Sequence, residues 1–397
     1  MMNKKLLIGI LICFAWGAAV QAEIPETGTF RTVISNKHPK ELKRTIQYHP
    51  DGDDFVCVNG KNRYTRALYG SITDFRIETS DRPVFAAHKP RNSRHICFRL
   101  QRGNRYVALD SLNFCEARYT AGRRTYRLTD PILGKGELNV SVLAFPDTEG
   151  GIWRFDMKNT PKDLVLHGYI SETRIPLLSR NGDMGADRPY CFDAPENPRK
   201  QKHNELKLDG ETTYVMVENL DLRLPSLTEG EALYEKAEKW RAEIASSLKF
   251  STPDPFFNPL GGALAIAADG IWDNQVWLHG AIGWRTQLNG WRAGYTGDFI
   301  GRHDRARTHF NSYAASQVTD VPVTIPHPAL DSVLHLARSV KKWGTPQYST
   351  GYICRTPNRK DLMHHYDMNL CYIDELLWHF NWTGDLDLSL IHISEPT

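Results

Sequence analysis

The sequence predicts an α+β multidomain protein, in which an N-terminal antiparallel β-sandwich is followed by a helical domain. From about residue 29 to residue 224, Gly, Pro, Asn and Asp interrupt the chain every ten residues or so, and the segments between them alternate apolar and polar side chains. Short alternating segments at regular spacing are typical of antiparallel strands. After about residue 228, the apolar residues recur at helical spacing instead.

The expected strands follow from this alternation. Residues 44–48 and 54–58 flank the turn Pro50-Asp51-Gly52, which predicts a β-hairpin. Further strands of the same kind are expected at residues 95–100, 137–143, 151–156 and 213–217.

The expected helices begin with a capping box, Thr228-Glu229-Gly230-Glu231, which opens a linker helix closed by the Pro-containing residues 251–255. Helical spacing then predicts helices at about residues 260–272, 298–317, 329–342 and 367–382. In the last of these, one apolar face is expected to consist of Leu370, Ile373, Leu377 and Phe380, and Asp374 and Glu375 are expected to face solvent.

The first 22 residues have the pattern of a secretory signal peptide. A short basic stretch precedes an apolar run, and the small-residue end Val20-Gln21-Ala22 predicts cleavage after Ala22. The apolar run is shorter than the roughly 20 residues that span a bilayer. The mature chain is therefore expected in a periplasm or outside the cell, without a membrane span.

Composition and motifs exclude several classes of function. The net charge is only +3, and no basic run with interleaved aromatic residues suggests nucleic-acid binding. The six cysteines after the signal form no C-x-x-C pair, so they are expected to be mostly buried free thiols, and no metal is expected. Neither a phosphate-binding glycine loop nor a serine nucleophile elbow is present, and no cofactor is predicted.

The order of a β-sandwich, a linker helix and serial helical hairpins resembles the six-hairpin glycosidases, in which a β domain precedes an (α/α)6 toroid. Three motifs resemble those of secreted proteins of the uncharacterised domain-of-unknown-function 4450 family. They are residues 290–298, His303-Asp304-Arg305-Ala306-Arg307 and Tyr366-Asp367-Met368-Asn369. The resemblance implies a toroid at residues 255–387, after a sandwich at 23–225 and a linker at 226–254.

Glycoside hydrolysis requires two carboxyl groups flanking the scissile bond. The resemblance implies a pocket at the N-terminal ends of the inner helices, and two loop-to-helix junctions are rich in suitable groups. At the first, Asp298 is a candidate catalytic residue, although it also suits a plain helix N-cap. Asp304 is expected to be a surface or ion-paired residue. Substrate-binding candidates here are Trp284, Trp291 and Arg292.

At the second junction, Asp367 is the candidate catalytic residue, with the same N-cap alternative. The candidates for binding substrate are His364, His365, Tyr366 and Asn369. Trp291, Arg292, Asp298 and Asp367 are expected to line one pocket.

The expected function is that of a secreted glycoside hydrolase-like protein acting on glycans derived from polysaccharides. Two alternatives stay open at this point: a non-catalytic glycan-binding protein, and a polysaccharide lyase that uses Tyr or His as its base. The last ten residues, 388–397, resemble translated sequencing adapter. The chain is therefore expected to hold only the first part of a toroid, and to be inactive by itself, because twelve helices of ~11–12 residues do not fit between residues 255 and 387.

Overall fold

The computed structural model describes most of the chain. The described residues are 29–32, 42–45, 47–61, 66–89, 92–171, 201–207, 212–280, 285–290, 294, 296–318, 329–330, 337–338, 351–357 and 366–388. The chain divides into two compact units, residues 1–49 and 50–397. In the first unit, β1 (Thr29–Thr32) pairs antiparallel with β2 (Leu42–Thr45).

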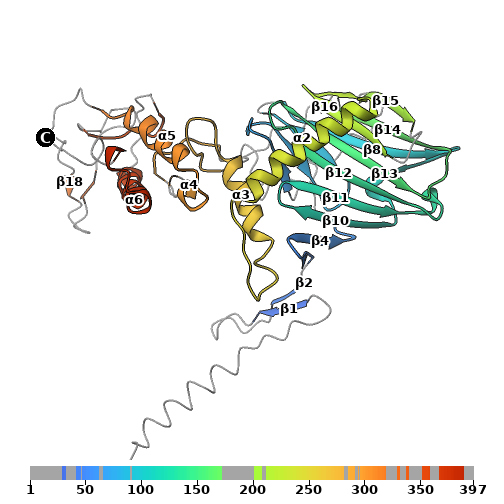
Figure 1. The fold of residues 1–397 in the computed structure, drawn as a ribbon, viewed down its shortest axis with the longest axis horizontal. Coiled ribbons are helices and arrows are strands. Elements are labelled where there is room, and N and C mark those ends of the chain that lie inside the picture. Colours follow the sequence, from blue (N-terminus) through green and yellow to red (C-terminus); the bar gives the residue numbers. More distant parts are fainter. Residues whose placement is uncertain are drawn as a thin grey trace, which may run out of the picture. The chain divides into compact units, whose positions relative to one another are not determined.

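Two antiparallel sheets form the larger part of the second unit (Figure 1). The eight-stranded sheet consists, in spatial order, of β17 (Asp221–Arg223), β16 (Thr212–Glu218), β13 (Gly150–Lys158), β12 (Glu137–Ala144), β11 (Arg123–Thr129), β10 (Phe114–Thr120), β4 (Asp54–Val58) and β3 (His49–Asp51). The seven-stranded sheet consists of β15 (Gln201–Lys207), β14 (Leu164–Ser171), β8 (Arg94–Arg102), β7 (Phe85–His88), β6 (Arg76–Thr79) and β5 (Arg66–Leu68), with β9 (Arg105–Ala108) paired to β8. The expected antiparallel β architecture is confirmed.

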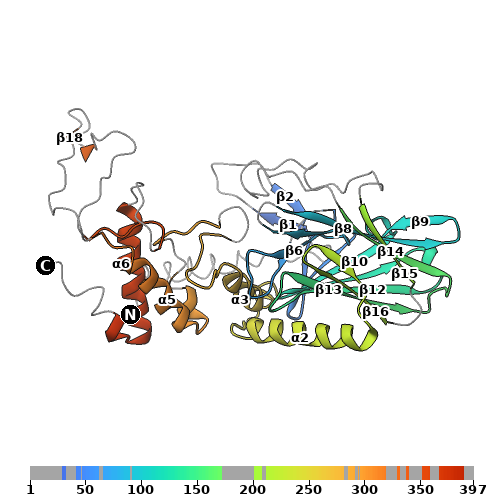
Figure 2. The same ribbon diagram turned by 90° about the horizontal axis from the view of Figure 1, so that it is seen from above.

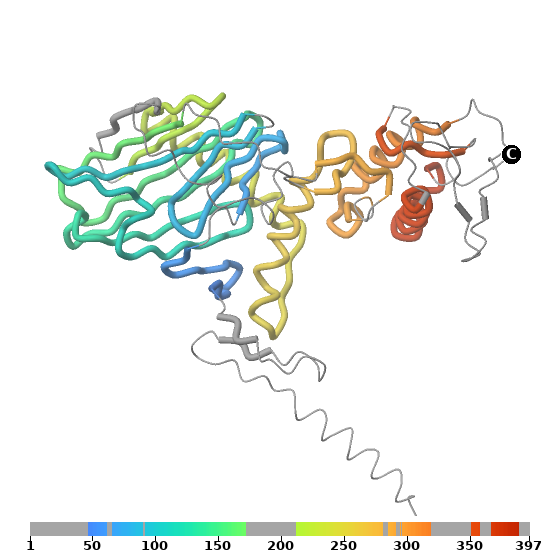
Figure 3. Tube along the Cα trace, turned by 180° about the vertical axis from the view of Figure 1, so that it is seen from behind, coloured from blue at the N-terminus to red at the C-terminus, as the bar shows by residue number. Residues whose placement is uncertain are grey.

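The core lies between the two sheets, which run as stacked layers (Figure 3). Phe85 and Phe98 come from the seven-stranded sheet, and Trp153 and Phe155 come from the eight-stranded one. The rings of Phe85 and Trp153 meet edge to face, with their centroids 5.5 Å apart, and those of Phe98 and Phe155 are 5.1 Å apart. Alternation along β13 points Trp153 and Phe155 inward, as the period of a strand requires.

Helix α2 (Leu227–Ala245) lies along the outer face of the eight-stranded sheet (Figures 1 and 2). Tyr234 and Ala237 pack there against Ile152 and Tyr214, which are buried on the outer side of the sheet. The expected capping box is displaced by two residues, because Ser226 accepts the hydrogen bond of the Glu229 N–H at 3.2 Å. A helix was thus correctly predicted here, and it is fixed on the sheet by its own apolar face.

A second group of helices follows. These are α3 (Leu260–Gly270), α4 (Thr296–Phe299), α5 (His303–Ala314) and α6 (Tyr366–Thr383). Helices α5 and α6 contribute to a second core, which contains Trp277, Phe310, Tyr372 and Leu376. Ile266 of α3 packs instead with Ile244 of α2. The loop after α3 is joined to the β part because Arg285 donates to the Thr73 carbonyl at 2.8 Å.

Two of the expected helices differ from those observed. The helix expected at 298–317 is interrupted at Gly301, whose positive φ of 73° leaves the helical conformation, so α4 and α5 are separate. Of the expected range 329–342, the structure describes residues 329–330 and 337–338, which form the paired antiparallel strands β18 (Ala329–Leu330) and β19 (Ala337–Arg338). Strand pairing overrides the expected helix at these four residues.

Helix α6 occupies almost the range expected for it, but with a different buried face. Its buried residues include Tyr372, Glu375, Leu376 and His379, whereas the expected apolar face is largely exposed at Leu370, Ile373 and Leu377. The expectation that Glu375 faces solvent is wrong, because its carboxylate accepts a hydrogen bond from the Gly294 N–H at 3.1 Å.

The remaining sequence-based expectations concern the cysteines, the end of the chain and the membrane. Cys57 and Cys115 are buried free thiols, as expected, and Cys354 is buried as well, whereas Cys191 lies outside the described residues. Leu388, the first residue of the expected artefactual segment, is buried, and residues 389–397 lie outside the described part. Among the described residues, no helix combines the length and the apolar character that crossing a bilayer requires.

Candidate functional site

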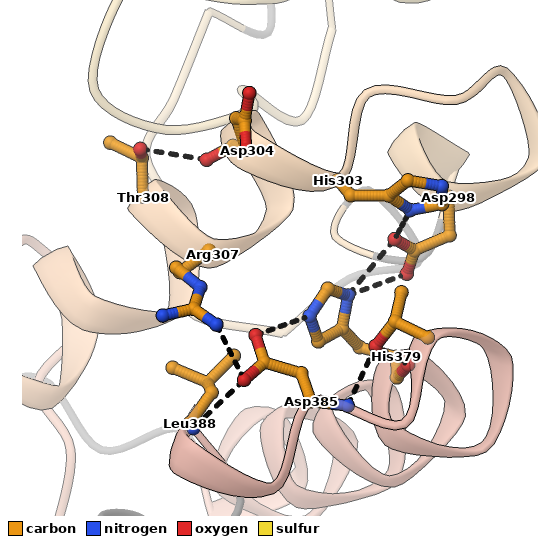
Figure 4. Close-up of polar contacts among 9 residues, drawn as sticks. Asp298, His303, Asp304, Arg307, Thr308, His379, Asp385 and Leu388 are labelled. Atoms are coloured by element: carbon orange, nitrogen blue, oxygen red, sulfur yellow. Dashed lines mark hydrogen bonds and ion pairs between the residues drawn. The ribbon is translucent and has the colours of Figure 1, made fainter.

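Polar side chains from α4, α5 and α6 meet in one cluster (Figure 4). Asp298 belongs to α4, His303 is the first residue of α5, and His379 lies in the last turns of α6. Helix α6 ends at Thr383, and the next residue, Gly384, has a φ of 69° and donates its N–H to the Phe380 carbonyl at 2.7 Å. This reversal brings Asp385 back beside His379.

The Asp298 carboxylate is the centre of the cluster. Its Oδ1 lies 2.9 Å from Nδ1 of His303, and both of its oxygens lie 2.9 Å from Nδ1 of His379. The Asp298 side chain is buried, so these two histidines take the place of water around its charge. Asp298 therefore holds the start of α5 to the end of α6, rather than only capping a helix.

His379 lies between two carboxylates. Its Nε2 is 3.4 Å from Oδ2 of Asp385, on the side of the ring opposite to Asp298. Burial opposes a charge on this ring, but the hydrogen bonds and charges of Asp298 and then of Asp385 raise the pKa of His379 above its ordinary value. Both ring nitrogens are occupied, so His379 is a structural link between the two acids.

Asp385 is in turn held from three sides. Its Oδ1 accepts from Arg307 at 2.6 Å and from the Leu388 N–H at 3.1 Å, and its Oδ2 faces His379. Burial opposes the ionisation of Asp385, but the Leu388 N–H, His379 and Arg307 together lower the pKa of its carboxyl. The result is a chain of polar contacts that runs from His303 through Asp298, His379 and Asp385 to Arg307.

A cavity of about 430 Å3 lies against this cluster. Trp382 forms part of its wall, is 52% exposed, and packs on Phe299 with ring centroids 4.7 Å apart. Asp304 is exposed in the same wall, and its side chain points away from His379 (Figure 4). The residues lining the cavity are His303, Asp304, Arg307, His379, Trp382, Thr383 and Asp385.

The two predicted catalytic carboxylates are not brought together. Asp298 contacts α6 at His379, whereas Asp367 is exposed in the first turn of the same helix. Twelve residues of helix separate these positions, or about 18 Å along the axis. The carboxyl groups of a glycosidase pair are only ~5–9.5 Å apart. Asp367 therefore does not serve as the acid/base partner of Asp298 at this distance.

Of the predicted binding residues, Asn369 is described and has a structural contact. Its side chain accepts from the Ile353 N–H at 2.8 Å and donates to the Ile353 carbonyl at 2.9 Å. Trp284, Trp291, Arg292, His364 and His365 lie outside the described residues, as does the side chain of Tyr366. Their roles in binding substrate stay predictions.

Sequence reasoning missed His379, Asp385 and Glu375, and it did not single out His303. One signal was present, because Tyr372, Leu376 and His379 recur on one face of α6 at helical spacing. A histidine in that pattern marks a buried polar contact, but its partner Asp298 is distant in the sequence. Within the described residues, no group of three or more His, Cys, Asp or Glu side chains is arranged to hold a metal ion.

Comparisons with known proteins give two findings. Residues 90–232 match the model of a family described as a domain of unknown function (DUF4450), which confirms the resemblance to that family. The match covers β-strands and the start of α2. It therefore lies before the motifs from which the resemblance to this family was inferred. No curated protein matches the chain.

Among solved structures, a bacterial glucoamylase complexed with acarbose matches at 9% sequence identity and a TM-score of 0.39. The match covers 74% of this chain and 54% of that chain, so the present chain spans about half of the glucoamylase structure.

Proposed function

We propose that this protein is a glycoside hydrolase-like protein that binds a glycan in the cavity beside Trp382. The main support for this proposal is that an exposed indole ring lines the same cavity as the polar side chains of His303, Asp304 and Arg307. The flat C–H face of a sugar ring stacks on an aromatic ring, and its hydroxyls require hydrogen-bonding groups at the edge.

The ring of Trp382 is suited to this role because Phe299 supports it from one side. A supported ring loses little conformational freedom when a ligand binds to its open face. The second exposed tryptophan of α6, Trp378, is also 52% exposed but does not line the cavity. The proposal therefore distinguishes two tryptophans that are equally accessible on the same helix.

The charged groups of the wall divide into engaged and available ones. Asp385 uses one carboxylate oxygen for Arg307 and the other for His379, and Asp298 is occupied by two histidines. Asp304 is the exposed carboxylate of this wall, and it supplies hydrogen-bond acceptors for sugar hydroxyls. The single available carboxylate keeps non-catalytic glycan binding as the alternative to hydrolysis, because hydrolysis requires both an acid and a base.

The proposal extends to the architecture that the resemblance implies. In it, α3 to α6 belong to an (α/α)6 toroid of the six-hairpin glycosidases, at residues 255–387, and residues 23–225 form its companion sandwich. The substrate is then a polysaccharide-derived glycan met in a periplasm or outside the cell. Glycoside hydrolysis by the whole protein is part of the same proposal.

The test is calorimetric titration of the 397-residue chain with pectic, arabinogalactan and hemicellulose oligosaccharides. We expect one of these classes to bind, Trp382→Ala to weaken binding about fivefold or more, and the matched variant Trp378→Ala to bind as the unaltered chain does. Loss of a stacked ring of this kind costs about 1–2 kcal/mol, which corresponds to a factor of about 5–30. Equal weakening by both variants, or no binding by any oligosaccharide, would refute the proposed site.

A further inference from the structure

His303 differs from His379, the other histidine that contacts Asp298, in how it is held and exposed. Its Nδ1 lies 2.9 Å from the buried Asp298 carboxylate, while 47% of its side chain is exposed and its ring lines the cavity. Among the described residues, no hydrogen bond or ion pair involves the second ring nitrogen, Nε2. His303 is thus anchored at one nitrogen and open at the other.

This geometry fixes the tautomer of a neutral His303. A carboxylate oxygen accepts hydrogen bonds, so the hydrogen of the ring lies on Nδ1 and points at Asp298. The lone pair is then on Nε2, where a ligand in the cavity can reach it. His379 contacts the same carboxylate but is buried, and its Nε2 faces Asp385. It therefore has no nitrogen to offer to a ligand.

We infer that His303 is the proton acceptor of this cavity and that Asp298 is a positioning residue, which acts through His303 instead of touching the substrate. The inference rests on the proposed function and assigns its missing base. A buried acid that orients a histidine, whose other nitrogen meets the substrate, is an arrangement known to activate weak nucleophiles. Here the group to be activated is a water molecule beside a bound glycoside.

Nε2 of His303 takes a proton from water while the water oxygen forms a bond to the anomeric carbon. The glycosidic C–O bond breaks, its electron pair stays with the leaving oxygen, and that oxygen takes a proton from a second water molecule. The products are two sugars with free hydroxyls, and the proton held by His303 returns to solvent, where it neutralises the hydroxide left by that second water. Every side chain that this step needs belongs to the described part of this chain, so we expect the chain to release reducing ends by itself, contrary to the inactivity predicted from the sequence.

The charged surroundings of His303 come from three elements. Asp298 on α4 faces its Nδ1, Asp304 follows it on α5, and His379 on α6 shares the Asp298 carboxylate. If His303 transfers protons, then replacing Asp298 must alter the pH dependence of turnover, whereas a purely structural contact would lower the amount of folded protein and leave that dependence unchanged.

The experiment compares His303→Gln, Asp298→Asn and the control Thr308→Ala, which lies exposed on the same helix outside the cavity lining. Each is titrated with the oligosaccharide that binds the unaltered chain best, and release of reducing ends is measured over a range of pH. We expect His303→Gln to bind within about threefold of the unaltered chain and to lose ~100-fold or more in turnover. Asp298→Asn should displace the pH profile at a KM within about threefold, and the control should match the unaltered chain.

A second readout does not depend on turnover. Diethyl pyrocarbonate modifies accessible imidazole nitrogens, and mass spectrometry locates the modified residue. We expect His303 to react, the bound oligosaccharide to protect it at least fivefold, and His379 to stay unmodified. Binding without protection of His303, binding without release of reducing ends, or turnover of His303→Gln within threefold of the unaltered chain would each overturn the assignment while leaving glycan binding intact. Absence of any binding would instead remove the proposed function, and an unreactive His303 would then remove the open Nε2 as well.

Discussion

Asp298 and His379 lie 81 residues apart in the chain, yet both carboxylate oxygens of Asp298 are 2.9 Å from Nδ1 of His379. The contact joins α4 to the last turns of α6, and both side chains are buried. It fixes the wall of the cavity because His303 and Asp385 depend on the same two residues. The stability of this part of the protein should therefore depend on the protonation of His379.

We predict that His379→Gln destabilises the protein most at mildly acidic pH. The folded state raises the pKa of His379, so its contribution to stability is fully present below the unfolded pKa of about 6.5 and is lost as pH rises through the folded pKa. Removing one partner of a buried pair costs about 3 kcal/mol. Urea unfolding of both proteins from about pH 5.5 to about pH 9 measures the difference, which should shrink as pH rises. A difference independent of pH would contradict the bridging role.

The two faces of α6 provide a second prediction. Leu376 is 1% exposed and packs in the second core, whereas its neighbour Leu377 is 40% exposed. Leu376→Ala should therefore lower the free energy of unfolding by about 2–5 kcal/mol. Leu377→Ala, the matched control, should change it by less than about 0.5 kcal/mol. If the costs are reversed, the face expected from the sequence is the buried one.

Residue patterns alone predicted a helix almost identical to α6, but they selected the wrong face. Both faces carry apolar residues, and the apolar spacing of Leu370, Ile373 and Leu377 is as regular as that of Tyr372 and Leu376. The buried face also carries the polar residues Glu375 and His379, so its sequence does not look apolar. Their burial is tolerated because Gly294 and Asp298 supply hydrogen bonds. Such partners are invisible to a local pattern, since they are remote in the sequence.

The β part was more predictable because a strand that is buried on one face records that burial in its own alternation. Along β10 and β11, every second residue is buried, so polarity and burial share one period. The candidate site was less predictable. Asp298 was singled out as a candidate catalytic residue, and that role stays a prediction. Its two histidine partners depend on how α4, α5 and α6 pack, which no spacing within a single element reports.

A third prediction concerns the close approach of Gly297 to Trp277. A Cβ atom at residue 297 would lie 2.0 Å from the indole ring of Trp277, which is buried in the second core. Gly297→Ala should therefore force the ring or α4 to shift and destabilise the protein by about 1–3 kcal/mol. Thermal unfolding measures the effect.

The control for that substitution is Gly301→Asn in the neighbouring turn. Gly301 has a φ of 73° and no atom within 4 Å of an added Cβ, and asparagine tolerates this conformation better than other residues. It should cost clearly less than Gly297→Ala. Equal melting temperatures for Gly297→Ala and the unaltered chain would show that α4 does not pack on Trp277 at this distance.

The last prediction separates the cavity described above from the second loop-to-helix junction predicted from the sequence. Asp304 lines the cavity, whereas Asp367 is exposed in the first turn of α6, about 18 Å along the helix from His379. A hydrogen bond to a charged group contributes about 1.5–3 kcal/mol, so Asp304→Asn should weaken glycan binding about tenfold or more. Asp367→Asn makes the same chemical change on α6 as Asp304→Asn makes on α5, but it should leave glycan binding unchanged. It should reduce stability only through the helix dipole, by about 0.3–1 kcal/mol. Calorimetric titration of both variants with the same oligosaccharide decides between the two places. If Asp367→Asn weakens binding and Asp304→Asn does not, the glycan lies at the N-terminal end of α6, and the catalytic role predicted for Asp367 gains its first support.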